Sequence, residues 1–392
     1  MLSTATHTRR LVKVISVLVL AGLVLWLSLT LLERGLGRGY EADFVQNTWL
    51  GGHLVLSGDS PYDPAAWQAA KDAFLPRPDI FPYYIYPIWV AILAAPFALL
   101  SPLQALAVWT TLNLLFMFLS LKLVYRLTQR RLPAMEAMVL LLLSLLFLPT
   151  WHLLLEGQIN MLLLFILLAS MAGMQARSFW LNGALLSLAL AKPQSSWLLV
   201  GAILWWVLVR RRWSEVIGFV GGSILLWLGP LALYPDWWSR WLEITRVQSV
   251  YLMEITPSVW GLAFQWVPGH AQVLALGVSL VILAISAWWW LRRLSVPGTE
   301  LWETAPLTIV GLVISLYGLL YEQVLLLFPF WLCWQWANRR SWRWLLMGWN
   351  ILLPLGALAL LAVNPPHGLV YAIAQPLTLL PIYFSLKPDR PE

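Results

Sequence analysis

Apolar runs with few charges recur along this chain, and most of them approach the length that crosses a lipid bilayer. A helix needs about 20 apolar residues to span the ~30 Å hydrocarbon core. Hydrophobic residues make up 60% of the chain and charged residues only 11%, too few to cover a soluble domain. Twelve runs qualify, at 11–33, 103–127, 134–153, 158–174, 180–192, 196–210, 215–234, 271–293, 303–320, 322–338, 342–363 and 369–386. The sequence therefore predicts an all-α polytopic membrane protein with about 12 transmembrane helices, in a range of roughly 10 to 13.

The positive charges indicate how these spans are oriented. Lys and Arg gather at the N-terminus and then at 126–131, 210–212, 292–293 and 339–343, which are alternate connections between spans. Because connections rich in Lys and Arg stay in the cytoplasm, both termini are predicted to lie there. The net charge of +7 is then a topology signal, and no nucleic-acid partner is expected.

Two apolar segments near the N-terminus are interpreted differently from each other. The run 86–100 contains Pro87 and Pro96, and counting it as a span would reverse every later loop, so it is predicted to lie in the outer interface. The run 11–33 is too long for the apolar core of a signal peptide and lacks a small-residue cleavage site, so it is predicted as the first span. Cys333 is the only cysteine, which excludes a disulfide within one chain and a cysteine metal cluster.

The chain is predicted to form a single membrane domain, residues 1–392, without a soluble domain or an obvious repeat. Its parts are the first span (1–33), an acidic outer loop with interfacial helices (34–102), a middle bundle (103–234), a second outer loop (235–270) and a C-terminal bundle (271–392). In the first loop, 42–56 has helical spacing that ends at Gly58, and 60–64 forms a turn. In the second, Pro235 and Asp236 favour the start of an interfacial helix over 237–251.

Asp43 is the first candidate for chemistry. It lies about ten residues beyond the first span, at the start of an interfacial helix, with Glu41 two residues before it. A carboxylate at this boundary suits a general base that acts on a hydroxyl acceptor while a lipid-linked donor waits in the bilayer. A helix N-cap or a first-turn acid is an equally good interpretation of Asp43.

Asp59 and Asp63 lie in a segment rich in turn-forming residues. They could hold a divalent cation, but hard cations need several convergent oxygens, and this spacing resembles no closed metal cage. A turn that folds the loop is the simpler interpretation. No metal and no cofactor is therefore predicted, with a divalent cation left as an alternative.

Polar side chains interrupt the apolar runs at three further places. Gln158 and Asn160 offer amides at the mouth of a helix, where an amide in lipid needs a partner, although Asn160 also fits a helix cap. Lys192 precedes the helix-breaking Pro193 and suits an anionic lipid phosphate, with snorkelling to a headgroup as the alternative. Glu322 is a lone acid between two apolar helices, expected to orient Lys192 or an arginine, to contact sugar, or to favour a helix N-terminus.

Tryptophan is unusually frequent, with 27 residues. Those near the basic helix ends fit an interfacial belt, which is the usual role of Trp in membrane proteins. Those on the acidic side fit a belt as well, but could instead stack on sugar or lipid. They are Trp49, Trp67, Trp237, Trp238, Trp260 and Trp266.

The order of these motifs along the chain is distinctive. They are the acid pair Glu41 and Asp43, the turn from Gly58 to Tyr62 and Asp63, Tyr84-Ile85-Tyr86-Pro87, Gly157-Gln158-Ile159-Asn160, Ala191-Lys192-Pro193, Thr256-Pro257-Ser258-Val259-Trp260-Gly261 and Tyr321-Glu322-Gln323. Over about 40–330 the chain resembles the GT-C-fold glycosyltransferases of glycosyltransferase family 87, which are polyprenol-phosphate-mannose-dependent mannosyltransferases. It differs where the family often has Tyr-Pro-Pro, here Tyr86-Pro87-Ile88, and where Asn-Gln-Ser is frequent, here Thr256-Pro257-Ser258.

This resemblance implies an inverting transfer of a sugar, expected to be mannose, from a polyprenyl-phosphate donor to a lipid or glycan acceptor. Asp43 matches the catalytic acid of the first outer loop, and Lys192 would face the donor phosphate, where leaving-group charge develops. Substrate-binding positions are expected at Glu41, Tyr62, Asp63, Gln158, Asn160, Lys192, Ser258, Trp260, Glu322 and Gln323. The resemblance further implies a bacterial inner membrane location among membrane lipids, with the active site facing the periplasm or cell exterior.

Two other classes of function remain open from the sequence. A flippase or transporter for lipid-linked oligosaccharides would be expected to show two related halves with helices broken at matching positions, and no such symmetry is visible. A non-catalytic membrane subunit of polysaccharide assembly would tolerate the loss of Asp43 without losing sugar transfer. The long acidic loop after the first span favours the glycosyltransferase.

Overall fold

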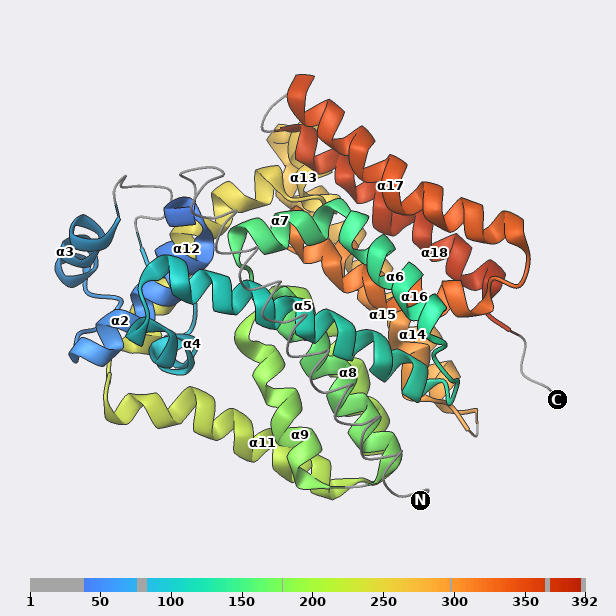
Figure 1. Cartoon of the computed structure of the whole chain (residues 1–392), viewed down its shortest axis with the longest axis horizontal. Coiled ribbons are helices and arrows are strands. Elements are labelled where there is room, and N and C mark those ends of the chain that lie inside the picture. Colours follow the sequence, from blue (N-terminus) through green and yellow to red (C-terminus); the bar gives the residue numbers. More distant parts are fainter. Residues whose placement is uncertain (1–38, 76–82, 178, 297, 364–366, 389–392) are drawn as a thin grey trace, which may run out of the picture. The chain divides into compact units, whose positions relative to one another are not determined.

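Helices joined by turns make up the described part of the chain in this computed structural model, and no strand occurs there (Figure 1). The structure describes residues 39–75, 83–177, 179–296, 298–363 and 367–388, so the predicted first span lies outside the described residues. The elements up to the middle of the chain are η1 (Gly39–Glu41), η2 (Phe44–Trp49), α2 (Leu50–Ser57), α3 (Pro64–Phe74), α4 (Ile88–Ala94), η3 (Ala95–Leu99), α5 (Pro102–Leu127), α6 (Ala134–Leu146), α7 (Leu148–Glu156), α8 (Asn160–Ala176), α9 (Trp180–Ser187) and η4 (Leu188–Ala191). The remaining elements are α10 (Pro193–Val209), α11 (Trp213–Leu228), η5 (Gly229–Ala232), α12 (Trp237–Ile255), α13 (Val259–Trp266), η6 (Pro268–His270), α14 (Ala271–Leu294), η7 (Leu301–Thr304), α15 (Ala305–Val313), η8 (Leu320–Leu326), α16 (Leu327–Trp336), α17 (Arg340–Val363), η9 (His367–Ile373) and α18 (Ala374–Leu386).

The chain divides into two compact units. The first holds the chain up to Tyr84 together with Val90–Leu115 and Leu154–Gly157. The second holds Ile85–Trp89, Phe116–Leu153 and Gln158–Glu392. The described part of the acidic loop therefore belongs mainly to the first unit, and most of the apolar helices belong to the second.

Membrane-spanning length is reached by few of the helices. Within the described residues, three are long and apolar enough to cross a bilayer, namely Pro102–Leu127, Trp213–Ala232 and Pro268–Leu294. Helices α6 and α7 are bent by 70° relative to each other at a short break. They would give a fourth span only if the two helices together counted as one broken span. Helical membrane architecture is thus confirmed. The predicted number of twelve spans is not, because several apolar runs form helices of 10–17 residues.

Breaks within the apolar runs explain these short helices. The predicted span 180–192 consists of α9 followed by the single 3-10 segment η4. Pro193 then starts α10 at its first helical position, where proline is tolerated because its missing N–H would be unsatisfied anyway. Lys192 therefore lies at a break between two helical segments, as the sequence predicted.

The first outer loop contains one more helix than the sequence predicted. The expected helix over 42–56 is present as η2, a π-helix, and α2, and it ends at Gly58 with φ +83°. The turn predicted at 60–64 is present, with the Asp63 N–H donating to the Ser60 carbonyl oxygen at 3.0 Å, and it leads into α3. Asp63 caps α3 by accepting hydrogen bonds from the amides of Ala65 and Ala66, at 2.8 and 3.0 Å, with Pro64 at the first helical position. The predicted interfacial helices over 86–100 and 237–251 appear as α4 with η3 and as α12.

Helices α9 and α11 lie side by side in the second unit because small residues face one another (Figure 1). A Cβ atom on Gly218 would lie 1.8 Å from the Trp180 carbonyl oxygen, and one on Gly183 would lie 1.9 Å from the Glu215 carbonyl oxygen. Such contacts let two helix backbones approach closely, which is how helices in lipid gain packing energy. The glycines are therefore required by the interface between the two helices.

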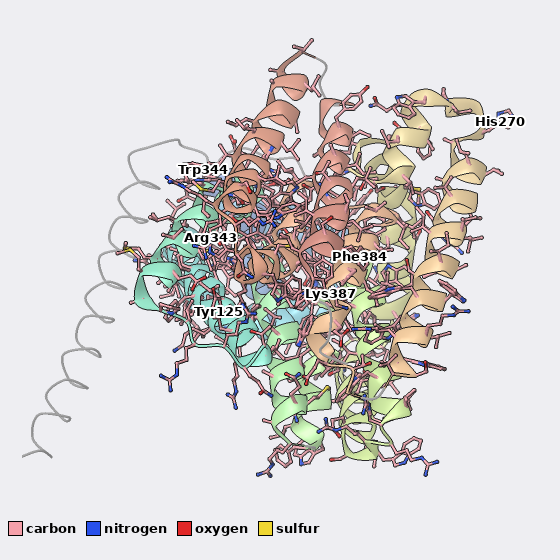
Figure 2. All side chains as sticks on the ribbon, turned by 90° about the vertical axis from the view of Figure 1, so that its right-hand side faces the viewer. Tyr125, His270, Arg343, Trp344, Phe384 and Lys387 are labelled. Carbon is pink, nitrogen blue, oxygen red and sulfur yellow. The ribbon has the colours of Figure 1, made fainter. Side chains whose placement is uncertain are left out.

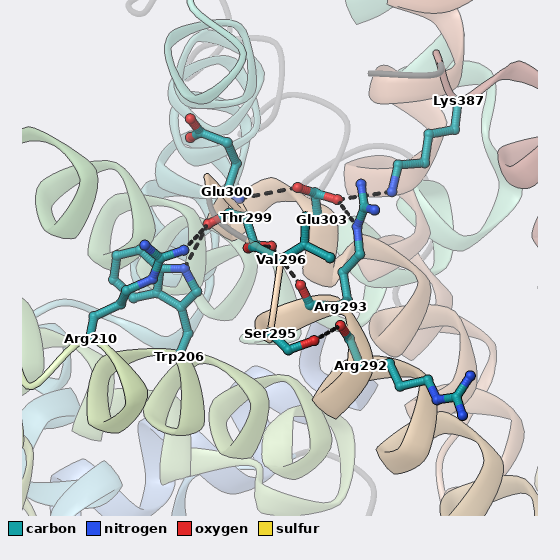
Figure 3. A network of polar contacts seen from close by, with 10 residues as sticks. All are labelled: Trp206, Arg210, Arg292, Arg293, Ser295, Val296, Thr299, Glu300, Glu303 and Lys387. Atoms are coloured by element: carbon teal, nitrogen blue, oxygen red, sulfur yellow. Dashed lines mark hydrogen bonds and ion pairs between the residues drawn. The ribbon is translucent and has the colours of Figure 1, made fainter. Parts of the chain in front are cut away.

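The C-terminal helices are fastened to the end of α14 by a buried carboxylate (Figure 3). Glu303 is fully buried and forms ion pairs with Arg293 of α14 and with Lys387, whose Nζ lies 2.9 Å away. Figure 2 shows Lys387 at the C-terminal end of α18 and His270 at the N-terminal end of α14. A buried acid with two cationic partners ties α14, η7 and α18 together in the second unit.

The interface between α9 and α11 gives a direct test of the helix packing. We expect Gly218→Leu to lower the stability of the protein in detergent by about 1–3 kcal/mol or more, because the added side chain overpacks a backbone contact. Gly221→Leu is the matched control, since a Cβ atom there meets open space. Thermal unfolding of both variants is the measurement, and equal stability would contradict the packing.

Candidate functional site

Asp43 forms the centre of a buried polar group in the first unit, which we name the Asp43 cluster (Asp43, Asn47 and Glu156). Asp43 is only 3% exposed. Its Oδ1 accepts a hydrogen bond of 2.9 Å from the Asn47 amide, one helical turn later. Its backbone N–H donates to Glu156 Oε2 at 3.2 Å. Asp43 precedes η2 but makes no side-chain cap hydrogen bond, so the capping interpretation is not supported.

Aromatic packing fixes the backbone on both sides of this cluster. The Phe44 ring stacks on Trp109, with ring centroids 5.4 Å apart and planes 12° apart. The Trp109 indole N–H donates to the Gly157 carbonyl oxygen at 2.7 Å. Gly157 has φ +63°, and a Cβ atom there would lie 2.5 Å from Phe44 Cβ. The turn after Glu156 is therefore held against the segment after Asp43 by contacts that only glycine allows.

Glu156 is a partly buried acid at the tip of α7, beyond the predicted span and outside the three spanning helices. Burial and, to a smaller extent, the negative charge of Asp43 raise the pKa of its carboxyl, the hydrogen bond from the Asp43 N–H lowers it, and the resulting pKa is about 7. At neutral pH Glu156 is therefore present in both protonation states. Two carboxyl groups can then lie together without two full charges at all times.

The rings of Tyr62 and Tyr84 pack against each other in the same unit. Their ring centroids lie 5.4 Å apart, and both side chains are buried. Burial raises the pKa of Tyr62 well above its usual value, and the neighbouring Tyr84 raises it further. Burial likewise raises the pKa of Tyr84, which the charge of Asp43 also raises while a backbone bond at Ala91 lowers it. Both phenols thus stay neutral, and Tyr62 acts here as a packed ring.

The Lys192 cluster (Lys192, Gln158, Asn160, Tyr321 and Glu322) is the second buried polar group and belongs to the second unit. Lys192 Nζ donates to Gln158 Oε1 at 2.8 Å and to Asn160 Oδ1 at 2.9 Å. It forms an ion pair with Glu322 Oε1 at 3.1 Å and lies 4.5 Å from the centre of the Tyr321 ring. An ammonium has three N–H donors, so each has one acceptor here.

Burial decides between two interpretations of Lys192. Its side chain is 4% exposed and that of Glu322 is 5% exposed, so the lysine is not extended toward a headgroup. Of the partners that the sequence left open for Glu322, Lys192 is the one with which it forms an ion pair. Asn160 is the first residue of α8, and the N-cap position is Ile159. The Asn160 side chain accepts a hydrogen bond from the Lys192 ammonium.

The other predicted site residues have structural partners. Ser258 caps α13, accepting a hydrogen bond of 3.2 Å from the Trp260 amide, and the buried Trp260 packs with Ala263, Ala271 and Ala275. Gln323 donates to the Ala372 carbonyl oxygen at 2.9 Å. Glu41 lies in η1 and is partly buried, and its charge adds to the rise in the pKa of Glu156. Asp63 caps α3, as described above.

The sequence did not single out three side chains that the structure brings into these clusters. Glu156 immediately precedes the Gly157-Gln158 motif, and its partner Asp43 is distant in sequence. Tyr86 donates its hydroxyl to Gln158 Oε1 at 3.2 Å, and Tyr321 packs against the ammonium. Tyr86 and Tyr321 belong to motifs that the sequence showed and Glu156 directly precedes one, but their contacts join segments far apart in the chain. Of the acidic-side tryptophans, Trp49, Trp67 and Trp237 are fully buried, so neither a belt nor stacking on a ligand describes them.

Candidate metal ligands do not gather anywhere in the described ranges. No group of three or more His, Cys, Asp or Glu side chains is placed there to hold an ion. Asp63 already uses its Oδ1 as a helix cap, and Asp59 is exposed. The candidate site residues that the structure brings together in the described ranges are therefore those of the Asp43 cluster and the Lys192 cluster.

A helical membrane protein with a buried acid in its large polar loop and a buried, fully bonded ammonium fits the class of membrane-embedded enzymes. Residues 84–320, more than half of the chain, match glycosyltransferase family 87. The chain belongs to this family and is a glycosyltransferase. No curated protein and no solved structure matches it. The matched region contains Gln158, Asn160 and Lys192, whereas Asp43 and Glu322 lie outside it.

Gly157 gives a test of the Asp43 cluster. We expect Gly157→Ala to destabilise the protein by about 1–2 kcal/mol through its positive φ, and by about 1–3 kcal/mol more through the clash with Phe44. Gly58→Ala is the matched control, because Gly58 also has a positive φ but faces open space. Thermal unfolding of both proteins separates the two effects, and equal losses would mean that the packing against Phe44 is unimportant.

Proposed function

We propose that the protein transfers a sugar, mannose in the first instance, from a polyprenyl-phosphate donor to a lipid or glycan acceptor, with inversion at the sugar carbon. The observation that carries the proposal is the buried Asp43, whose carboxylate is held by Asn47 and whose backbone N–H is held by Glu156, in a chain of glycosyltransferase family 87. The setting is a bacterial inner membrane, with the reaction at the periplasmic or outer face. Polyprenyl-phosphate donors are available there, whereas nucleotide sugars stay in the cytoplasm.

Asp43 has the properties of a general base in this reaction. It takes the proton of the acceptor hydroxyl while that oxygen attacks the anomeric carbon of the donor. The bond between the anomeric carbon and the phosphate oxygen breaks, and polyprenyl phosphate leaves with the electron pair. The Asn47 amide holds one carboxylate oxygen in place, and Glu156 holds the Asp43 backbone, so little reorganisation is required of the base.

Lys192 is the cation that we assign to the donor phosphate. Negative charge grows on the phosphate as the bond to the sugar breaks, and a fixed ammonium stabilises that charge. The ammonium already has Gln158, Asn160 and Glu322 as acceptors, and only Glu322 carries a negative charge. Donor binding therefore exchanges one anion for another on Lys192, with the Glu322 carboxylate giving way to the phosphate.

Asp43→Asn tests the general base. We expect sugar transfer to fall by about 10²–10⁴-fold, the usual contribution of a positioned base, while donor binding is retained. Asp72→Asn is the control in the same loop, because Asp72 is exposed and accepts a hydrogen bond from the nearby Gln68 side chain. Transfer from a polyprenyl-phosphate mannose is measured in nanodiscs with EDTA present. Undiminished transfer in Asp43→Asn would remove Asp43 from this role.

Glu322→Gln tests the exchange of anions on Lys192. Glutamine keeps the shape and an acceptor oxygen but removes the competing charge, so we expect the KM for the donor to fall several-fold. Lys192→Met is the companion variant, expected to raise that KM at least tenfold. Thermal unfolding identifies variants that lose their fold, since an unpaired buried charge is destabilising. A higher donor KM in a folded Glu322→Gln protein would show that Glu322 binds the donor rather than competes with it.

A further inference from the structure

An apolar pocket of about 310 Å³ lies in the second unit between α10, α14 and α15. Its lining is hydrocarbon and indole, with Ser286 as the one hydroxyl side chain. Two tryptophans of α10, Trp197 and Trp205, lie eight residues apart on one helix face, with Gly201 midway between them. Because Gly201 carries no side chain and a Cβ atom there would meet open space, the hollow lies between the two indoles.

The inner side of this pocket is formed by a buried side chain, and its rim is formed by exposed side chains. Trp290 of α14 is buried and donates its indole N–H to the Ala202 carbonyl oxygen at 3.2 Å, so its polar group is satisfied within the protein. Trp197, Trp205 and Leu291 are 40%, 47% and 48% exposed at the rim. Helix α14 is one of the spanning helices and α10 carries no charge, so the rim faces hydrocarbon.

The size and lining of the pocket match a hydrocarbon chain. Ligand pockets begin at roughly 300 Å³ and are lined mainly by apolar and aromatic side chains. An apolar cavity of about 150 Å³ holds one benzene ring, so this hollow has room for about two groups of that size. Planar, methyl-branched isoprene units present flat faces to indole rings, which favours a polyprenyl chain over a flexible acyl chain.

The position of the pocket along α10 connects it with Lys192. Lys192 is the N-cap of α10, and a helix rises 1.5 Å per residue. Trp197 therefore lies about 8 Å and Trp205 about 20 Å along the helix from Lys192. Lys192 and the pocket are thus carried by one helix and lie between about 8 and 20 Å apart along its axis.

We propose that the pocket lined by Trp197, Gly201, Trp205 and Trp290 binds the polyprenyl tail of the sugar donor. The proposal rests on the proposed function, because it takes the donor to be a polyprenyl phosphate. The Lys192 cluster then holds the phosphate, and the pocket holds isoprene units further along the tail. The pocket residues of α10 then determine how tightly donors with tails of different length bind.

Gly201→Phe tests the pocket, because a Cβ atom at Gly201 meets open space and a phenyl ring attached there would occupy the hollow. We expect the KM for a long-chain polyprenyl-phosphate mannose to rise about tenfold, while the KM for a donor with two isoprene units is unchanged. Gly201→Ala, which adds one methyl group, is expected to have a small effect. Gly277→Phe on α14 is the matched control, since a Cβ atom there also meets open space but does not line the pocket.

A second measurement separates this proposal from the proposed function. A photoreactive long-chain polyprenyl monophosphate without sugar is crosslinked to the wild-type protein in nanodiscs, and the modified peptides are identified. Crosslinks on α10 and α14 that disappear in Gly201→Phe support the tail site, even if no sugar transfer from polyprenyl phosphate is found. Crosslinks confined to other helices, or equal KM values for the long-chain donor in wild type and Gly201→Phe, overturn it. A phospholipid acyl probe that labels the pocket and is not displaced by polyprenyl phosphate also overturns it.

Discussion

The buried ammonium of Lys192 is the constraint on which much of the second unit depends. A charge in a low-dielectric interior is very costly unless it is paired and hydrogen-bonded. Its acceptors come from three places: the turn before α8, the first residue of α8, and η8. These segments must all converge on the break before α10. The helix ends of this region are therefore placed by one cation as well as by apolar packing, which is non-directional.

The Asp43 cluster is organised by shape rather than by opposite charge. Its two acids have the same sign, and the favourable contacts are an amide bond, a backbone N–H and a stack of aromatic rings. Gly157 makes this arrangement possible, because any side chain there would displace Phe44. The chain passes from the first unit to the second at the Gly157–Gln158 peptide, so Glu156 and Gln158 are two residues apart in sequence and serve different clusters.

The sequence predicted the features that depend on local pattern. Helical membrane class, the helix end at Gly58 and the helix break at Lys192 follow from apolar runs, glycine and proline, and the structure contains them. Lys192 was one of the partners that the sequence left open for Glu322, since an acid near membrane level needs a partner. The contact between Glu156 and Asp43 was not, because it joins residues 113 positions apart and no periodicity records it. The predicted number of twelve spans is not confirmed, because composition identifies an apolar run but not the 3-10 segment that interrupts it.

The short helices and the polar clusters both follow from the need to satisfy backbone polar groups inside a membrane protein. A helix that ends within an apolar region leaves backbone groups that lipid cannot satisfy, so such ends must face protein or a polar site. Between η4 and α10, the Ser196 hydroxyl donates to the carbonyl oxygens of Ala189 and Lys192, at 2.7 and 3.1 Å. The same break directs the Lys192 side chain toward Gln158, Asn160 and Glu322. An uninterrupted helix over 180–209 would bond these carbonyl oxygens to its own amides, and it would not place the ammonium at a break. The deviation from regular transmembrane helices is thus what places the Lys192 ammonium, the group to which we assign the donor phosphate.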